Sequence, residues 1–399
     1  MSFLAVIPYL LYYNTGRQKW QSQIIGNDAR LQGPAHRLIL CIHLKEEGGI
    51  PLIDRCFLGA NTPEGFRSEY RSLQSDPTIH RLLILKGGPG CGKSTLMKTV
   101  AEAAEKLGLR TRRIFCSSDP ESLDGLVVPE LGFAIADGTA PHVLEPELCG
   151  CGENYINLGR FYRASQAAEA GIRAEKNENR LCYGPVYAAL AGCAAAQQGM
   201  QAIAGPTGEE ICREALRQLG REKLPEGTGN GHVLRCYLSG ITPAGMVSFE
   251  PSGRTVWVIR DSFRLAAPLL GRLCAAYRKA GHDVVLAMDP LDPDQPAGLL
   301  VPELETAYLR TDPLFPLGKK ALKQLNLDAA AESEIPAQRR ERMTELLALR
   351  TGFAEEALFW LRRAKVHHDA LESLCRPMVD FDGVTAETGR IVQTLLNEA

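Results

Sequence analysis

Residues 82–95 read LLILKGGPGCGKST, and the rest of the chain is organised around this stretch. A run of apolar residues typical of a buried strand leads directly into a glycine-rich loop. Leu96, Met97 and Val100 then give the next segment the apolar face of a helix. Residues 87–94 match the phosphate-binding pattern G-x-x-x-x-G-K-[ST] in full. The sequence therefore predicts a strand, a phosphate-binding loop and a helix in succession.

The spacing within this loop follows from the chemistry of phosphate. Glycine adopts backbone conformations closed to other residues, so the loop N–H groups turn inward as an anion-binding nest at the start of a helix. Lys93 reaches the outer phosphates, and the Ser94 hydroxyl is placed to bind Mg²⁺. The residues expected to hold the nucleotide are Gly87, Gly88, Pro89, Gly90, Cys91, Gly92, Lys93, Ser94 and Thr95.

Composition sets the broad class. The chain has 399 residues, of which 45% are hydrophobic and 23% charged, so we expect an ordinary globular protein of two or three domains. A net charge of −2 gives no signal for nucleic acid. The 12 cysteines lack the spacing of a disulfide scaffold, which favours reduced thiols in a cytoplasmic protein.

The N-terminus is expected to contribute little. The apolar run from Phe3 to Tyr13 is about half the length of a membrane span, and it lacks the flanking features of a signal peptide. Residues 1–50 show no clear period beyond short apolar runs. We expect an N-terminal extension that is poorly ordered or not part of the fold.

Two sequence patterns recur at nearly equal distances. Residues 55–65, RCFLGANTPEG, return at 235–245 as RCYLSGITPAG, and VPEL at 128–131 returns at 301–304. Two collinear matches predict a tandem duplication, which must be considered before any other feature. We call residues 51–230 the first half and 231–399 the second half; the glycine-rich stretch 226–231 is the expected linker.

Each half is expected to hold an α/β domain with a helical extension. In the first half we expect strands at Leu82–Lys86, Thr111–Cys116 and Phe133–Asp137, a helix at Lys93–Leu107 and a polar loop at Ser117–Gly125. Alternating strands and helices favour a parallel sheet covered on both faces, as in P-loop NTPases. The extensions are predicted as helices at 179–204 and 209–219, and at 336–349, 354–374 and 385–397.

The second half lacks the phosphate-binding residues. Its segment 257–269, WVIRDSFRLAAPL, aligns with the phosphate loop and keeps only the strand, and Asp261 brings in a negative charge. The next strand is expected at Val284–Asp289. The second half is therefore predicted to be a degenerate copy that does not bind nucleotide in this way.

Asp137 is the main candidate for a metal-binding carboxylate. P-loop enzymes place an aspartate at the end of a strand beside the loop, where it holds Mg²⁺ directly or through water. At the offset of the VPEL repeat its counterpart is Arg310, so the carboxylate disappears together with the phosphate loop. The alternative is a strand-end aspartate that caps the turn at Gly138.

Three acidic residues, Asp119, Glu121 and Asp124, fall in the polar loop at the expected carboxyl edge of the sheet, where ligands bind. Asp124 becomes Ala297 in the second half, which makes it the candidate to orient water or a substrate hydroxyl. A solvated acidic loop is the alternative. His142 is a weaker candidate for contact with phosphate or substrate, because a lone loop histidine is more often structural or exposed.

The segments 86–98, 116–125, 128–131 and 137–142 together resemble a family of bacterial tandem P-loop ATPases, largely uncharacterised and labelled ATPase or nucleotide-kinase-like. The resemblance extends from about residue 54 to the C-terminus. It implies ATP as the nucleotide and implies no particular substrate. Members of this family usually carry a phosphate loop in each half, and this chain departs from them in its second half.

These observations predict a cytoplasmic, ATP-binding P-loop NTPase with one site. Lys93 and the loop amides would stabilise the β,γ-phosphates, and Ser94 and Asp137 would hold Mg²⁺ during hydrolysis. One alternative is a kinase that acts on a small molecule or nucleotide, with the 117–125 loop as acceptor site. Another is a non-enzymatic, ATP-gated switch read by a protein partner.

Overall fold

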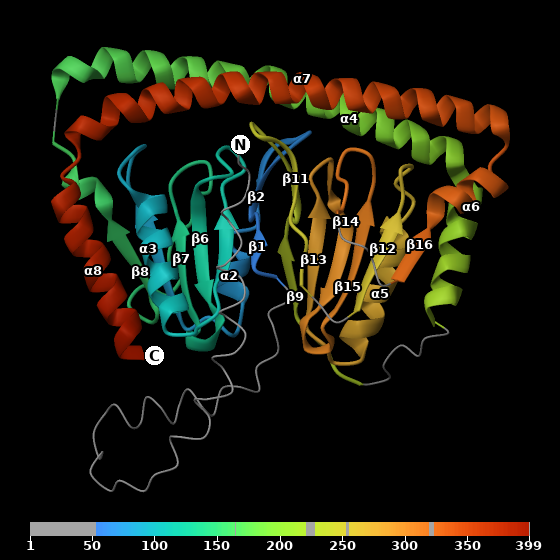
Figure 1. Ribbon diagram of the computed structural model, residues 1–399, viewed down its shortest axis with the longest axis horizontal. Coiled ribbons are helices and arrows are strands. Elements are labelled where there is room, and N and C mark those ends of the chain that lie inside the picture. Colours follow the sequence, from blue (N-terminus) through green and yellow to red (C-terminus); the bar gives the residue numbers. More distant parts are fainter. Residues whose placement is uncertain (1–52, 164, 221–227, 253–254, 319–322, 399) are drawn as a thin grey trace, which may run out of the picture. The chain divides into compact units, whose positions relative to one another are not determined.

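The structure is a computed structural model that describes residues 53–398 except for 164, 221–227, 253–254 and 319–322 (Figure 1). The predictions for residues 1–50 and for the start of the linker lie outside the described residues. The described part is an α/β protein with two six-stranded sheets, one in each half.

The first sheet has the strand order β1-β5-β6-β7-β4-β8. Its strands are β1 (Arg55–Cys56), β4 (Arg81–Lys86), β5 (Arg112–Phe115), β6 (Leu123–Val128), β7 (Phe133–Asp137) and β8 (Glu153–Asn157). The three strands predicted from sequence are confirmed as β4, β5 and β7. β8 was missed because its residues, ENYIN, are polar and mostly exposed at the sheet edge.

The prediction of a parallel sheet was wrong in one respect. β6 runs antiparallel to both β5 and β7, whereas β1, β4 and β8 run parallel to their neighbours, so the sheet is mixed. The connections on either side of β6 are too short for the crossover that parallel strands require. Consequently Leu123, Asp124 and Gly125 lie in a strand and not in the predicted polar loop.

The second sheet repeats this arrangement. Its order, β9-β13-β14-β15-β12-β16, matches the first sheet strand for strand, with the same parallel and antiparallel pairings. The strands are β9 (Val233–Cys236), β12 (Thr255–Arg260), β13 (Val284–Asp289), β14 (Asp292–Val301), β15 (Thr306–Thr311) and β16 (Lys323–Asn326). β13 confirms the prediction for 284–289.

The helices are longer than predicted. The helix after the phosphate loop, α3 (Lys93–Lys106), is confirmed, and its counterpart is α5 (Ala267–Lys279). The two helices predicted within 179–219 are parts of α4 (Gln166–Gly220), which breaks at Gly205. Those predicted within 336–374 form one continuous helix, α7 (Ala337–Cys375), which lies between α6 (Leu327–Glu334) and α8 (Phe381–Glu398).

The helical extensions cross from one half to the other. The last turns of α4, including Ile211 and Ala215, share a core with Leu269 and Leu273 of α5 in the second half. α8 in turn shares a core with α3 of the first half. α4 and α7 pack along each other between these ends (Figure 1). The phosphate-loop helix of each half is therefore covered by a segment that belongs to the other half.

Two short hairpins join the halves. They are β2 (Gly59–Thr62) with β3 (Gly65–Ser68), and β10 (Ser239–Thr242) with β11 (Gly245–Ser248). Just before them, the backbone groups of Phe57 and Tyr237 exchange two hydrogen bonds of 2.9 and 2.8 Å. A short helix, α2 (Ser72–Ser75), follows the first hairpin, and one core cluster contains side chains of both sheets. All described cysteines are free, and none of the described helices could cross a membrane.

Candidate functional site

The phosphate loop of the first half has the backbone of an anion-binding nest. Gly90 and Gly92 have φ angles of +70° and +88°, which favour glycine, and Gly92 caps the N-terminus of α3. Gly87 is required for packing, since a Cβ there would lie 2.6 Å from the Cys91 sulfur. The predicted loop residues thus come together at the junction of β4 and α3, apart from the exposed side chain of Thr95.

A carboxylate from a distant helix lies in this loop. The Gly90 N–H donates a 3.2 Å hydrogen bond to Glu372 near the end of α7, and a Cβ on Gly90 would lie 3.2 Å from the Glu372 carbonyl oxygen. The Tyr162 hydroxyl donates to the carbonyl of Pro89 on the same loop. Nothing in the sequence pointed to Glu372 or Tyr162, because both contacts depend on how α7 and the segment after β8 pack.

Lys93 and Asp137 lie together at the carboxyl ends of β4 and β7. The Lys93 amine donates to the carbonyls of Gly87 and Gly88 at 2.9 and 3.1 Å and is 3.5 Å from an Asp137 oxygen. Asp137 also accepts hydrogen bonds from the Thr139 backbone and hydroxyl at 2.8 and 2.5 Å. Both the metal role and the turn-capping role expected for Asp137 are compatible with this position.

The Ser94 hydroxyl accepts a 2.9 Å hydrogen bond from the Leu123 N–H of β6. One hydroxyl and one carboxylate fit the way P-loop proteins hold Mg²⁺, with phosphate and water completing the octahedron. Among the described residues there is no group of three or more His, Cys, Asp or Glu that could hold a metal alone. The residues present therefore fit a metal that arrives with a nucleotide.

Asp124 and His142 form a buried pair. The His142 Nε2 lies 3.0 Å from an Asp124 oxygen. Asp124 is 7% exposed and His142 is 8% exposed. Asp124 is the extra residue of a β-bulge between β5 and β6, and bulges commonly re-aim side chains beside active sites. Because Gly125 pairs with Ala136, Asp124 and Asp137 are the next positions along the two strands.

Two further groups border this pair. The ring centroids of Tyr70 and His142 are 4.8 Å apart. Burial is the largest cause, and the charge of Asp124 the next, of a Tyr70 pKa well above its usual range. Burial likewise raises the pKa of the Cys116 thiol, and the charge of Asp124 and a hydrogen bond to it add to that shift. We call Tyr70, Cys116, Asp124 and His142 the polar cluster.

The other two acidic candidates lie elsewhere. Asp119 accepts a 2.8 Å hydrogen bond from the Ser122 hydroxyl and is 3.9 Å from Lys365 of α7. Glu121 contributes its backbone carbonyl to Lys98, on the outer side of α3. Neither joins Lys93 or the polar cluster, so of the three only Asp124 is brought to the site.

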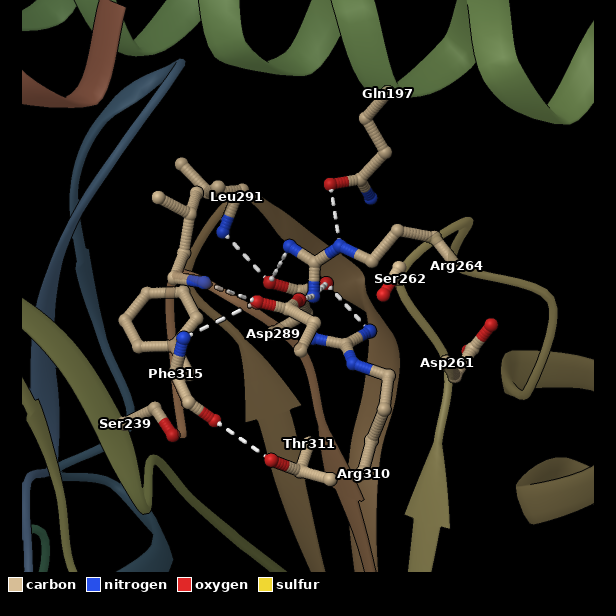
Figure 2. Close-up of polar contacts among 12 residues, drawn as sticks. Gln197, Ser239, Asp261, Ser262, Arg264, Asp289, Leu291, Arg310, Thr311 and Phe315 are labelled. Carbon is tan, nitrogen blue, oxygen red and sulfur yellow. Dashed lines mark hydrogen bonds and ion pairs between the residues drawn. The ribbon is translucent and has the colours of Figure 1, made fainter. Parts of the chain in front are cut away.

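In the second half, charged side chains fill the equivalent place (Figure 2). Arg264 has a φ of +65° at the position that matches Gly90, and it makes two contacts with Asp289, of 2.6 and 2.9 Å. Arg310, the counterpart of Asp137, contacts the same carboxylate at 2.9 Å. Gln197 of α4 accepts a 2.7 Å hydrogen bond from Arg264. The loop keeps the left-handed φ at this one position and holds an internal cation.

Asp261 fills the nest itself. Its two oxygens accept hydrogen bonds of 2.7 Å each from the N–H groups of Leu265 and Ala266, just before α5. Burial raises the pKa of Asp261 to about 7, although the two backbone hydrogen bonds act in the opposite direction. The sequence placed Asp261 in the loop but gave no sign of this intramolecular capping.

Comparisons with known proteins support a nucleotide-binding assignment in general terms. Residues 66–126 match the family described as nephrocystin 3, N-terminal. A stretch of 46 residues is 50% identical to the ATP-dependent RecD2 DNA helicase of Deinococcus radiodurans and covers 12% of this chain and 6% of the helicase. No solved structure matches. These likenesses point to a P-loop NTPase; membership of the bacterial tandem ATPases stays a prediction.

Proposed function

We propose that the first half is a Mg²⁺-dependent ATP-binding site that cleaves the β,γ-phosphate bond, and that the second half is its degenerate duplicate. The observation that carries the proposal is the folded motif: β4, a loop with two left-handed glycines and α3, with a carboxylate already hydrogen-bonded to a loop amide. A site that accepts Glu372 on Gly90 offers the donor that a phosphate requires.

Two sets of first-half residues have separate proposed roles, one toward phosphate and one toward Mg²⁺. Lys93 and the loop amides would compensate the charge of the outer phosphates, which is the main catalytic contribution in phosphoryl transfer. Ser94 and Asp137 would hold Mg²⁺, which neutralises charge on the phosphate oxygens when bound. Lys93 would exchange its contacts with the Gly87 and Gly88 carbonyls for phosphate.

One contact also favours the switch alternative. Glu372 lies near the C-terminal end of α7, and Arg350 of the same helix is 3.3 Å from Asp312, which follows the second-half strand β15. A nucleotide that replaces Glu372 on Gly90 would alter the attachment of α7. Such coupling is compatible with hydrolysis, and it gives a protein partner a surface through which to read the bound state.

The test is equilibrium titration of the full-length protein with Mg²⁺-ATP. We expect one site per chain, and we expect Lys93→Ala to weaken binding at least tenfold without a change in melting temperature. Lys98→Ala, a matched change on the outer side of α3, should bind like the wild type. Two sites per chain, or equal affinity in wild type and Lys93→Ala, would contradict the proposal.

A further inference from the structure

We infer that the polar cluster is the nucleophile site of the first half: His142 takes the proton from an attacking O–H group, and Asp124 positions His142. This inference rests on the proposed function and adds to it the residues that activate the nucleophile. The nucleophile is water or the hydroxyl of a small acceptor, which share this chemistry.

The cluster contains buried polar atoms with no hydrogen-bond partner among the described residues. They include the Tyr70 hydroxyl and the Nδ1 of His142. Leaving such a group unsatisfied costs about 1–3 kcal/mol, so native proteins keep few of them. Two more side chains without a hydrogen-bond partner border the cluster. Ser117 follows Cys116 in the chain. Asn61 is paired in the hairpin with Phe66, whose ring contacts that of His142.

The second half serves as an internal control, because apolar residues replace three of these polar groups there. Ala297 occupies the same bulge as Asp124, and Ile241 the same hairpin position as Asn61. At the offset of the VPEL repeat, Phe315 replaces His142. Ile241 and Phe315 are buried in one apolar cluster with residues of α4 and α7. The fold therefore does not need the polar groups, and they are lost together with the phosphate loop.

The second half also shows where the cluster lies relative to the phosphates. Asp289, the counterpart of Cys116, lies between Arg264 and Arg310, which match Gly90 and Asp137. The position of Cys116 is thus between the phosphate loop and Asp137. Asp124 hydrogen-bonds to Cys116, so the Asp124–His142 pair borders the place where the outer phosphate is expected.

The pair has the arrangement of a positioned base. With a carboxylate oxygen 3.0 Å from Nε2, a proton on that ring nitrogen avoids the repulsion between two lone pairs. Asp124 therefore fixes the proton on Nε2 and leaves the lone pair on Nδ1, the unsatisfied atom. A carboxylate that orients an imidazole in this way is the general design of an acid–base dyad.

The step balances without another reactant. The nucleophile oxygen bonds to the γ-phosphorus, the bond from that phosphorus to the β,γ-bridging oxygen breaks, and ADP leaves with the electron pair. The nucleophile's proton passes to Nδ1 of His142 and later to solvent. With water the product is inorganic phosphate, and with a hydroxyl it is a phosphate ester.

The experiment compares wild type, His142→Gln and the double variant Asp124→Ala/His142→Phe, which installs the residues of the second half. Glutamine can still donate to Asp124 but is a poor base. Each protein is given γ-labelled ATP alone, or with a mixture of ribonucleosides, hexoses and serine; released phosphate and labelled ester are both measured. ATP affinity and melting temperature are measured in parallel.

We expect His142→Gln to lose at least 100-fold in turnover in whichever arm the wild type is active, with ATP affinity within threefold. The double variant should lose turnover equally while its melting temperature is unchanged or raised, since apolar replacement of a buried pair is often neutral or stabilising. Wild-type turnover in His142→Gln, a lowered melting temperature in the double variant, or ATP binding without turnover in both arms would overturn the inference. Failure of the wild type to bind ATP would instead reject the proposed function.

Discussion

The loops before α3 and α5 share a left-handed φ at one position, Gly90 and Arg264, and differ in the anion that they hold. In the first half, Gly90 binds the Glu372 carboxylate of a distant helix, whereas in the second half Asp261 caps the nest from within the loop. At the position of Gly90, Arg264 keeps the left-handed φ and turns its side chain to buried aspartates. The left-handed position is therefore kept in a loop whose surroundings supply both an anion and a cation from side chains.

The largest effect is expected from breaking the internal cation site. Arg264→Ala leaves the buried carboxylates of Asp289 and Asp312 without a main partner, so we expect unfolding free energy to fall by about 3–5 kcal/mol. Chemical denaturation of the full chain measures this. Arg342→Ala, which removes an exposed ion pair with Glu345, is the control and should change stability by under about 1 kcal/mol. Equal, small losses in both would show that the network is not structural.

The next effect concerns the metal in the first half. Asp137→Asn should lower Mg²⁺-dependent turnover at least 100-fold, or about 2.7 kcal/mol in the barrier, because it removes the only carboxylate next to Lys93 in the described structure. Asp119→Asn, a matched change outside the site, should alter turnover less than threefold. Similar losses in the two variants would remove the basis for a metal role of Asp137.

Asp261, the capping aspartate of the second half, leads to a prediction about how stability depends on pH. Its folded-state pKa of about 7 lies above the 3.8 of a free aspartate, so between these values the folded chain retains a proton that the unfolded chain has lost. This group therefore lowers stability as pH rises, by about 1.4 kcal/mol per pH unit, and the effect ends above about pH 7. The slope of unfolding free energy from pH 5 to 6.5 should be smaller in Asp261→Asn; an unchanged slope would contradict the assignment.

The smallest effect is expected at Glu372, the carboxylate that accepts a hydrogen bond from Gly90 in the first half. Glu372→Gln keeps the helix and removes a negative charge at Gly90, so ATP affinity should rise about fivefold, near 1 kcal/mol. Asp369→Asn removes a charge one turn earlier, where Asp369 pairs with Lys365, and should change affinity less than twofold. Weaker ATP binding in Glu372→Gln would mean that the carboxylate assists the nucleotide and does not compete with it.

Much of the fold and part of the site could be predicted from local pattern. The boundaries of β7 and α3 follow from apolar runs and glycines, and the glycine spacing of residues 87–94 predicted the loop between β4 and α3. The first residues of β6 were predicted as part of a loop because Ser117–Gly125 is polar. The antiparallel direction of β6 follows from its short connections and has no local sequence signal. The helices 336–349 and 354–374 were separated although residues 350–353 continue the helix; of these only Arg350 is buried, where it contacts Asp312.

By itself, the sequence determined which half carries the complete phosphate-binding pattern, because the residues of that pattern are consecutive. Only the tertiary structure decided what lies opposite them. Glu372 meets Gly90 from 282 positions away, Asp124 meets His142 across a bulge, and α8 covers a helix of the other half. Such contacts depend on where long helices and strand edges finish after packing, a property of the whole chain that no local pattern encodes.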